Sequence, residues 1–159
     1  MKKLLLILAL TSLSYGTWTS GKHTFGPGGN ASKLAYAIDS LGNITAGTAC
    51  TLSFTATGSI TESVGATYTS AATCNGRLVI TSNTPPLGVF HGSPRLNISY
   101  AGALWLSIYP AGTTGVIEIE NLIFNFTGAD GATYGRINLS QITTTKFLVH
   151  DCKIGRAHV

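Results

Sequence analysis

The chain has 159 residues, and its ten lysines and arginines outnumber six acidic residues to give a formal net charge of +4. Four of the ten basic residues lie near the two ends: Lys2, Lys3, Lys153 and Arg156. The rest of the chain is neutral, so its charge does not indicate nucleic acid or an anionic membrane as a partner. Its richness in Gly, Ser, Thr, Asn and Ala is typical of an extracellular β protein that interacts with neutral sugars at most.

Residues 1–16, "MKKLLLILALTSLSYG", have the pattern of a secretory signal peptide. Two lysines precede an apolar run from Leu4 to Leu10, and small and polar residues follow, with a plausible cleavage site at Ser14 to Gly16. The apolar run is too short to span a bilayer, and no later stretch is long and apolar enough. We therefore expect a mature chain without a membrane span that is secreted or displayed at the cell surface.

The other end, "KIGRAHV", follows a strand pattern without any turn residues. It resembles one reading frame of the adapter DNA that is ligated to fragments for short-read sequencing. We therefore expect residues 154–159 to be read-through rather than native sequence, and residues 17–153 to be the N-terminal part of a longer domain. An ordinary C-terminus is the alternative.

Three cysteines leave one without a partner. Export permits a disulfide, and Cys50 with Cys74 would close a modest loop. However, Cys50 shares one face of "CTLSFTA" with Leu52 and Phe54, where a small buried thiol fits equally well. The sequence leaves both alternatives open. Cys152 is expected to be a core residue.

The pattern of elements predicts one helix followed by strands. Residues 30–42, "NASKLAYAIDSLG", place Leu34, Ile38 and Leu41 on one face, with Asn30 or Ser32 as candidate N-caps. Short apolar runs separated by Gly, Pro, Asn and Thr follow it to the end of the chain, so the rest reads as all-β. The predicted strands are residues 51–58, 77–83, 96–100, 104–109, 116–128, 137–140 and 146–154.

Two segments thirty residues apart change phase at the same point. In "IEIENLIF" (residues 117–124) the apolar positions move from odd to even numbers across Asn121, and in "FLVHDCKI" (147–154) they move across Asp151. Asn and Asp tolerate the left-handed region and can form a sharp corner between two strands. A corner repeated in every coil indicates a parallel β-helix, whose stacked coils share one core. Two similar hairpins of a β-sandwich are the alternative.

The segment "GVIEIENLIFNFTGADGATYGRINLSQITTTKFLVHDCKI" (115–154) resembles two coils of the right-handed parallel β-helix proteins related to pectate lyases. That family often has "I-x-I-x-N-L-x-F" followed one coil later by "V-x-(N/D)-C-x-I". Residues 26–42, "GPGGNASKLAYAIDSLG", are similar to its lead-in, where a helix caps the first coil. The resemblance implies an all-β right-handed parallel β-helix with an N-terminal capping helix. It also makes Ca²⁺ a possible cofactor, and it is nearly silent on activity.

Candidate site residues are few. Glu118 and Glu120 project outward from one strand, where a pair at that spacing can bind a cation or act as acid and base, although a solvated strand face is the more common case. Asp130 lies in a glycine-rich loop that can line a groove, and Arg136 follows that loop and can contact an acidic sugar. His150 beside Asp151 suggests a dyad. The alternation of apolar residues in this strand points His150 outward and puts Asp151 at the corner, so we do not expect the two side chains to act together.

Aromatic residues add one candidate. Trp105 lies in "YAGALWLSIYP", and sugars stack on exposed aromatic rings, although a Trp that fills the interior of a coil is the more common case. His23 and His91 have no partners at metal-ligand spacing. No catalytic constellation is present.

Two functional classes remain open. The first is a polysaccharide lyase or glycoside hydrolase of the pectate-lyase-like type, with its catalytic coils beyond residue 153. The second is a non-catalytic adhesin, surface protein or phage fibre. In both, the expected partner is a polysaccharide or cell-surface glycan, because stacked parallel strands offer a long surface to an extended polymer. This expectation rests on an analogy between folds.

Overall fold

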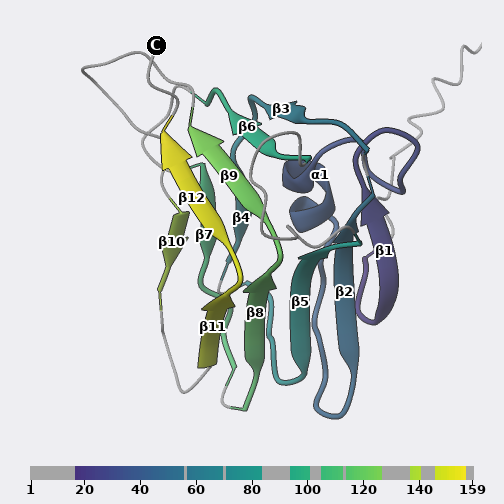
Figure 1. Cartoon of the computed structure of the whole chain (residues 1–159). Helices are drawn as coiled ribbons and strands as arrows, with labels where there is room; N and C mark the ends of the chain where they lie inside the picture. Colours follow the sequence, from purple (N-terminus) through teal and green to yellow (C-terminus); the bar gives the residue numbers. More distant parts are fainter. Residues whose placement is uncertain are drawn as a thin grey trace, which may run out of the picture.

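The chain forms a parallel β-solenoid of about three turns, as shown by a computed structural model (Figure 1). The structure describes residues 17–55, 57–69, 71–83, 94–100, 105–112, 114–126, 137–140 and 146–156. The predicted signal peptide and residues 157–159 of the predicted read-through lie outside this range. Residues 154–156 lie within it, in the last strand.

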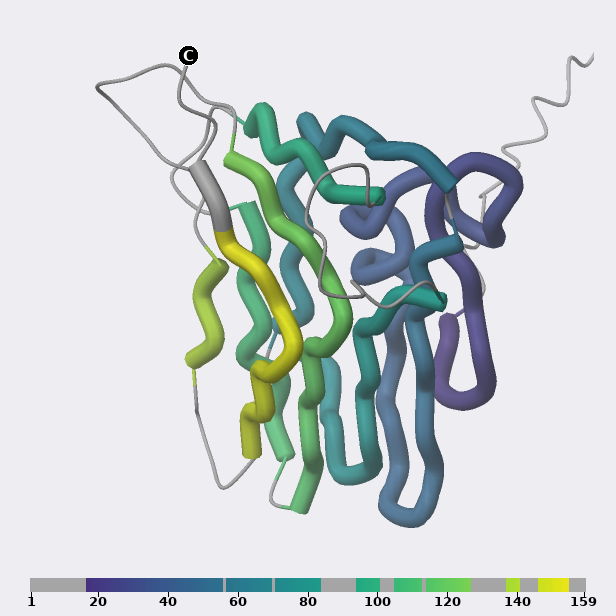
Figure 2. The backbone as a smooth tube through the Cα atoms, viewed as in Figure 1, coloured from purple at the N-terminus to yellow at the C-terminus, as the bar shows by residue number. Residues whose placement is uncertain are grey.

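Successive coils stack their strands into three parallel sheets, and each of the coils β2–β4, β5–β7 and β8–β10 contributes one strand to every sheet (Figure 2). The strand orders are β1-β2-β5-β8-β11, β12-β9-β6-β3 and β10-β7-β4, so a strand generally lies beside the strand three places away in the chain. The bounds are β1 Gly21–Phe25, β2 Ala49–Phe54, β3 Ile60–Glu62, β4 Ala66–Tyr68, β5 Arg77–Ser82, β6 Leu96–Ile98, β7 Leu106–Ile108, β8 Val116–Glu120, β9 Ile123–Phe126, β10 Ile137–Leu139, β11 Lys146–His150 and β12 Lys153–Arg156.

The thirty-residue repeat predicted from the sequence is confirmed as stacking of one coil on the next. Phe147 pairs with Ile117, Val149 with Ile119, and Lys153 with Ile123, all in parallel register. All strand pairings among the described residues are parallel. The β-sandwich alternative is therefore wrong, because its sheets would be antiparallel.

The corner between two strands of a coil is made by a residue in the left-handed region. Asn121 has φ 56° and Asp151 has φ 51°, and these are the only non-glycine residues with positive φ in the described part of the chain. The corner consumes one residue, and the inward face therefore stays inward on both sides: Ile119 and Leu122 are both 2% exposed. This is the physical reason for the change of phase in the sequence.

The core is a set of rows that run along the solenoid. In the five-stranded sheet Cys50, Leu78 and Ile117 form one inward row by register. Leu52, Ile80 and Ile119 form the next, and all six side chains are at most 2% exposed. Each fully buried Leu or Ile contributes about 1.5–3 kcal/mol by the hydrophobic effect.

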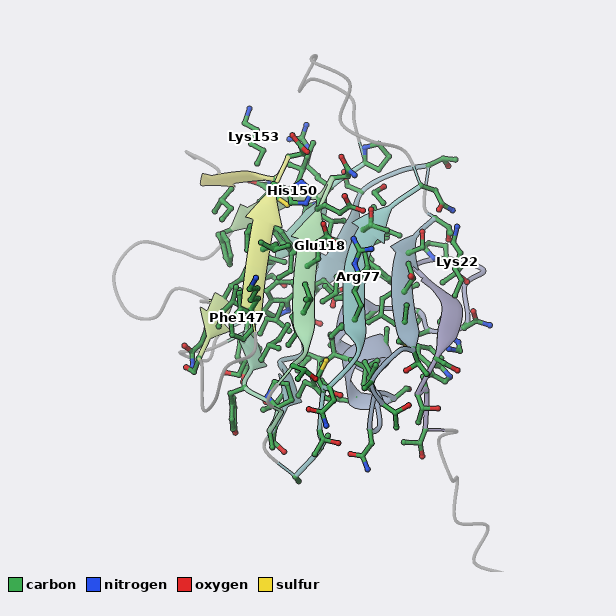
Figure 3. All side chains as sticks on the ribbon, turned by 90° about the horizontal axis from the view of Figure 1, so that it is seen from below. Lys22, Arg77, Glu118, Phe147, His150 and Lys153 are labelled. Carbon is green, nitrogen blue, oxygen red and sulfur yellow. The ribbon has the colours of Figure 1, made fainter. Side chains whose placement is uncertain are left out.

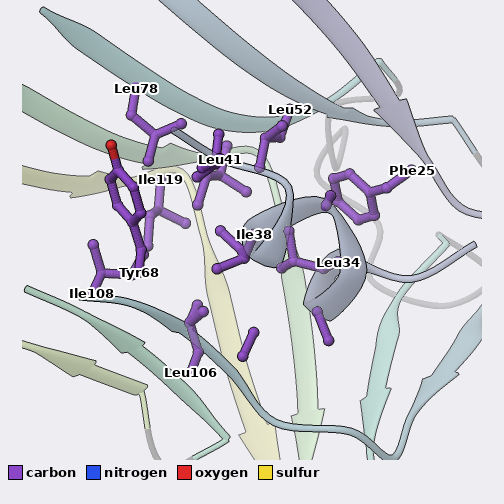
Figure 4. Packing of buried hydrophobic residues seen from close by; sticks show 14 of the residues in the cluster. Phe25, Leu34, Ile38, Leu41, Leu52, Tyr68, Leu78, Leu106, Ile108 and Ile119 are labelled. Carbon is purple, nitrogen blue, oxygen red and sulfur yellow. The ribbon is translucent and has the colours of Figure 1, made fainter. Parts of the chain in front are cut away.

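Helix α1 (Leu34–Asp39) packs against β4, β1 and β2, and its Leu34 and Ile38 point among core residues of several coils (Figure 4). It is shorter than the predicted helix over residues 30–42. Ala31 instead forms a parallel bridge with Phe25, and Leu41 forms one with Trp18, so strand-like contacts hold both flanks. No helix among the described residues is long and apolar enough to cross a membrane.

The predicted N-cap of the helix is also wrong. The N-cap is Lys33, which makes no side-chain capping bond, and Asn30 instead accepts hydrogen bonds from Thr24. The amide of Leu34 donates to Oε1 of Glu62 at 2.7 Å. A carboxylate from the neighbouring strand β3 thus replaces a local cap, which sequence patterns within the helix do not reveal.

Glu62 is completely buried, and its second oxygen, Oε2, has no hydrogen-bond partner within the described residues. Burial raises the pKa of Glu62 above its ordinary value, and the amides of Leu34 and Ala35 and the charge of Lys33 oppose that rise. The folded state therefore favours the neutral form of this carboxyl more than the unfolded chain does.

The strands at the C-terminal side, β10, β11 and β12, are paired on one side only among the described strands. Among the described residues, three of the four large apolar side chains that are exposed lie on β11 and β12: Leu148 at 44%, Val149 at 49% and Ile154 at 63%. Strands that have one unpaired edge and exposed apolar side chains tend to associate with another strand.

Substitution of Asn121 tests the left-handed corner. We expect Asn121→Val to lower the free energy of unfolding by about 1–3 kcal/mol, because a β-branched residue is strained at positive φ. Asn121→Gly is the matched control and should cost less than Asn121→Val, because glycine adopts this conformation without strain. Urea unfolding measures both, and equal losses for the two variants would contradict a conformational role for Asn121.

A second prediction concerns the buried carboxyl of Glu62. Because folding raises the pKa of Glu62, its neutral carboxyl stabilises the folded state. This contribution is complete below the pKa of Glu62 in the unfolded chain, and it is lost as the pH rises through its pKa in the folded state. Glu62→Gln keeps an oxygen for the Leu34 amide and does not ionise. We expect the wild type to lose stability relative to Glu62→Gln between about pH 4 and pH 8. Urea unfolding at both pH values measures the difference, and a constant difference would contradict the prediction.

Candidate functional site

The candidate site lies on the outer face of the five-stranded sheet. Side chains that alternate with the buried rows point outward, and Figure 3 shows Lys22, Arg77, Glu118 and His150 on four strands of this sheet. Because the strands are parallel and in register, these side chains form rows along the solenoid. Two rows are continuous by register: Ala49, Arg77, Val116 and Lys146; and Lys22, Thr51, Val79, Glu118 and Leu148. Beside them lie Thr24, Ser53 and Thr81 in one register set and Glu120 and His150 in another, and Ser53 and Val79 are buried.

Glu118 is the centre of a group of charged residues on this face, here called the Glu118 cluster: Arg77, Glu118, Glu120, His150 and Asp151. Arg77 donates from Nε to Oε2 of Glu118 at 3.0 Å, and its Nη2 also contacts this oxygen. Although Glu118 faces outward, it is only 6% exposed, because side chains of the flanking strands cover it. A buried carboxylate of this kind requires a positive partner, which Arg77 provides.

His150 joins the remaining carboxylates. Its Nε2 lies 2.8 Å from Oε1 of Glu118 and 3.9 Å from Oε2 of Glu120, and its Nδ1 lies 2.9 Å from Oδ2 of Asp151. Both ring nitrogens therefore face carboxylates, an arrangement that the doubly protonated imidazolium satisfies. The sequence does not predict that His150 and Asp151 act together, yet their side chains are in contact, because the corner brings the Asp151 side chain back toward the ring.

The charges of this cluster stabilise each other. Hydrogen bonds from His150 and Arg77 lower the pKa of Glu118, with burial opposing them. Hydrogen bonds to Glu118 and Asp151 raise the pKa of His150. A general acid or base works best when its pKa lies near the working pH. The shifts of Glu118 and His150 instead hold both residues in their charged forms.

Glu118, Glu120 and His150 could in principle hold a metal, since one donor atom of each lies within 4.8 Å of the others. The two oxygens of Glu118, however, already accept hydrogen bonds from Arg77 and His150. Ca²⁺ takes six to eight oxygen ligands, and a guanidinium in contact with the central carboxylate repels a cation. These residues therefore do not fit the Ca²⁺ that the family resemblance implies.

Three other sequence candidates are placed differently or lie outside the described residues. Trp105 is completely buried and packs edge-on against Phe124 and Phe126 at centroid distances of 5.9 and 6.5 Å, so it offers no ring face to a sugar. Asp130 and Arg136 lie outside the residues that the structure describes.

Cys50, Cys74 and Cys152 are free thiols in the structure, so Cys50 and Cys74 follow the alternative of buried thiols and not that of a disulfide. Both are completely buried, and burial raises the pKa of each to about 11. Cys152 is partly buried and packs against the core, with Sγ 3.5 Å from the carbonyl oxygen of Ile119. Thiols with these pKa values are poor nucleophiles at neutral pH.

Sequence reasoning missed Arg77 as a member of the site. The thirty-residue alignment does place His150 beside Glu120, and register confirms this pairing. Arg77 contacts Glu118 diagonally from the preceding coil, 41 residues away, across a segment whose repeat is irregular. Only the register of β5 against β8 reveals that contact.

Comparisons with protein families, with curated proteins and with solved structures found no match for this chain.

The pH dependence of stability tests the Glu118 cluster. Because folding raises the pKa of His150, protonation of its ring stabilises the folded state. This stabilisation is complete below the pKa of His150 in the unfolded chain, and it is lost as the pH rises through its pKa in the folded state. The lowered pKa of Glu118 adds stability that is lost only in more acidic solution. We therefore expect His150→Gln to destabilise the protein more at about pH 5.5 than at about pH 8.5, measured by urea unfolding.

His23→Gln is the matched control, since His23 stacks on Trp18 outside the cluster. A loss for His150→Gln that is the same at both pH values would show that the imidazole does not act through its charge.

Proposed function

We propose that this chain is part of an exported protein that binds an extracellular polysaccharide or cell-surface glycan along the outer face of the five-stranded sheet. The observation that carries the proposal is the set of outward rows on that face. Neighbouring strands lie about 4.8 Å apart, so the hydroxyl and charged groups of these rows are spaced at multiples of that interval along the solenoid, with apolar side chains at some of the positions between them. A polymer with a repeating unit can contact such rows along its whole length.

Several contacts hold the polar groups of this face in place. Lys22 donates from Nζ to Oδ1 of Asn83 at 3.0 Å, and Ser53 donates to the same oxygen at 2.5 Å. Arg77 is held by Glu118, while more than half of its side chain stays exposed. Preorganised donors lower the entropy cost of binding, which favours recognition of a flexible glycan.

We further propose that the solenoid is right-handed, that α1 caps its first coil, and that the chain belongs to the pectate-lyase-like superfamily. Crossovers between parallel strands of one sheet are right-handed in nearly all proteins. The buried face of α1 covers apolar residues that the first coil would otherwise expose. The paired motifs at residues 117–124 and 147–154 support the family assignment.

Binding without catalysis, as in an adhesin or fibre, agrees best with the described residues. Both oxygens of Glu118 are engaged, and its lowered pKa makes it a poor general acid. A polysaccharide lyase or glycoside hydrolase is the second candidate. It is favoured by the proximity of Glu118, Glu120 and His150, whose donor atoms lie within 4.8 Å of one another.

A binding assay with two charge-matched variants tests the proposal. The wild type, Arg77→Gln and Lys33→Gln are titrated with purified neutral, acidic and amino-sugar polysaccharides, and Kd is measured by calorimetry. Each variant removes one positive charge, but Lys33 lies beside α1 and bonds to Ser63. We expect Arg77→Gln to raise Kd about ten-fold through loss of charge-assisted hydrogen bonds, and Lys33→Gln to leave it unchanged.

Product analysis separates the two candidate functions. Unsaturated ends or new reducing ends in the same mixtures would identify a lyase or a hydrolase, whereas binding without products would identify an adhesin-like protein. If none of the polysaccharides binds, or if both variants weaken binding equally, the outer face is not the binding site.

A further inference from the structure

A second polar feature lies away from the outer face, at the C-terminal end of α1. It is an open hollow of about 350 Å³ between α1 and β4. Its lining includes the buried side chains of Ile38, on the helix, and Tyr68, and both belong to the core (Figure 4). Thr17, Asp39 and Asn43 line it with exposed polar groups. The hollow therefore combines apolar side chains with a few polar groups that a small ligand can contact.

The carboxylate of Asp39 lacks a positive partner. No ion pair joins Asp39 to another described residue, and no basic residue lies in the last turn of α1. Asp39 ends the helix, where the backbone carbonyls already make the potential negative. Burial raises its pKa, and the amide of Thr67 only partly opposes that rise. A positive group in the hollow would relieve this unfavourable arrangement.

The start of the described chain lies at the same hollow. The amide of Trp18 donates a hydrogen bond to the carbonyl oxygen of Ser40 at 2.7 Å, and the carbonyl oxygen of Trp18 accepts one from the amide of Gly42 at 3.0 Å. These two bonds fix the backbone immediately after Thr17 beside the residues that follow Asp39. Thr17 itself lines the hollow. The sequence independently predicts signal-peptide cleavage directly before this residue.

We propose that the hollow beside Asp39 is a binding site for a primary ammonium group, and that the α-amino group of Thr17 occupies it after cleavage of the Gly16–Thr17 bond. Hydrolysis of this bond adds the hydroxyl of water to the Gly16 carbonyl carbon and a hydrogen to the Thr17 nitrogen, which then takes up a proton from solvent. The new ammonium is the positive partner that Asp39 lacks. The ammonium of an amino sugar is the second possible source of the same chemistry.

The test compares the full chain before and after cleavage by a protease that leaves Thr17 as the first residue. The titration of the Asp39 carboxyl is followed by carbon NMR in both forms. Opposite charges lower the pKa of a carboxyl, so we expect the Asp39 titration to move to lower pH after cleavage. Acetylation of the new α-amino group should reverse this shift and raise the unfolding equilibrium constant about two- to five-fold.

Titration with glucosamine, and with N-acetylglucosamine as the neutral control, separates the two sources. We expect glucosamine to perturb the Asp39 signals in the uncleaved chain and not in the cleaved chain, and Asp39→Asn to abolish the response. Glucosamine binding of equal strength in both forms would overturn the role of the N-terminus. An Asp39 titration that cleavage leaves unchanged, together with no response to glucosamine, would overturn the ammonium site itself.

Discussion

The whole structure depends on in-register parallel pairing between strands one coil apart. Within one coil the strands belong to different sheets, so a coil cannot satisfy its own backbone groups. Neighbouring coils supply those hydrogen bonds, and the same register pairs inward residues with inward residues, such as Cys50, Leu78 and Ile117, and outward residues with outward residues, such as Glu118 and Leu148. Core, outer face and candidate site all follow from this single constraint.

In the last two coils the corners preserve the inward face along that register. A strand has a side-chain period of two, so any bend that consumes one residue reverses its faces. Asn121 and Asp151 absorb that residue in the left-handed region, and the apolar positions shift by one to remain inside. The same corner places Asp151 against His150, so one backbone feature shapes both the fold and the charged cluster.

The two polar features of the molecule differ in their electrostatics. In the Glu118 cluster every charge has a partner, and the pKa values of Glu118 and His150 move toward their charged forms. Such a surface recognises a ligand with groups that are already oriented. At the end of α1 the carboxylate of Asp39 has no positively charged partner among the described residues, and its raised pKa favours the neutral form. That feature calls for a positive group.

By itself, the sequence determined the repeating coil, because the phase change at Asn121 and Asp151 is a local property of backbone conformation and side-chain period. It also indicated the outward direction of Glu118, Glu120 and His150. Only the tertiary structure decided the ends of α1, the cap from Glu62, the burial of Trp105 and the contact of Arg77 with Glu118. These depend on register between segments 28 to 41 residues apart, where earlier coils vary in length and no local pattern records which residues meet.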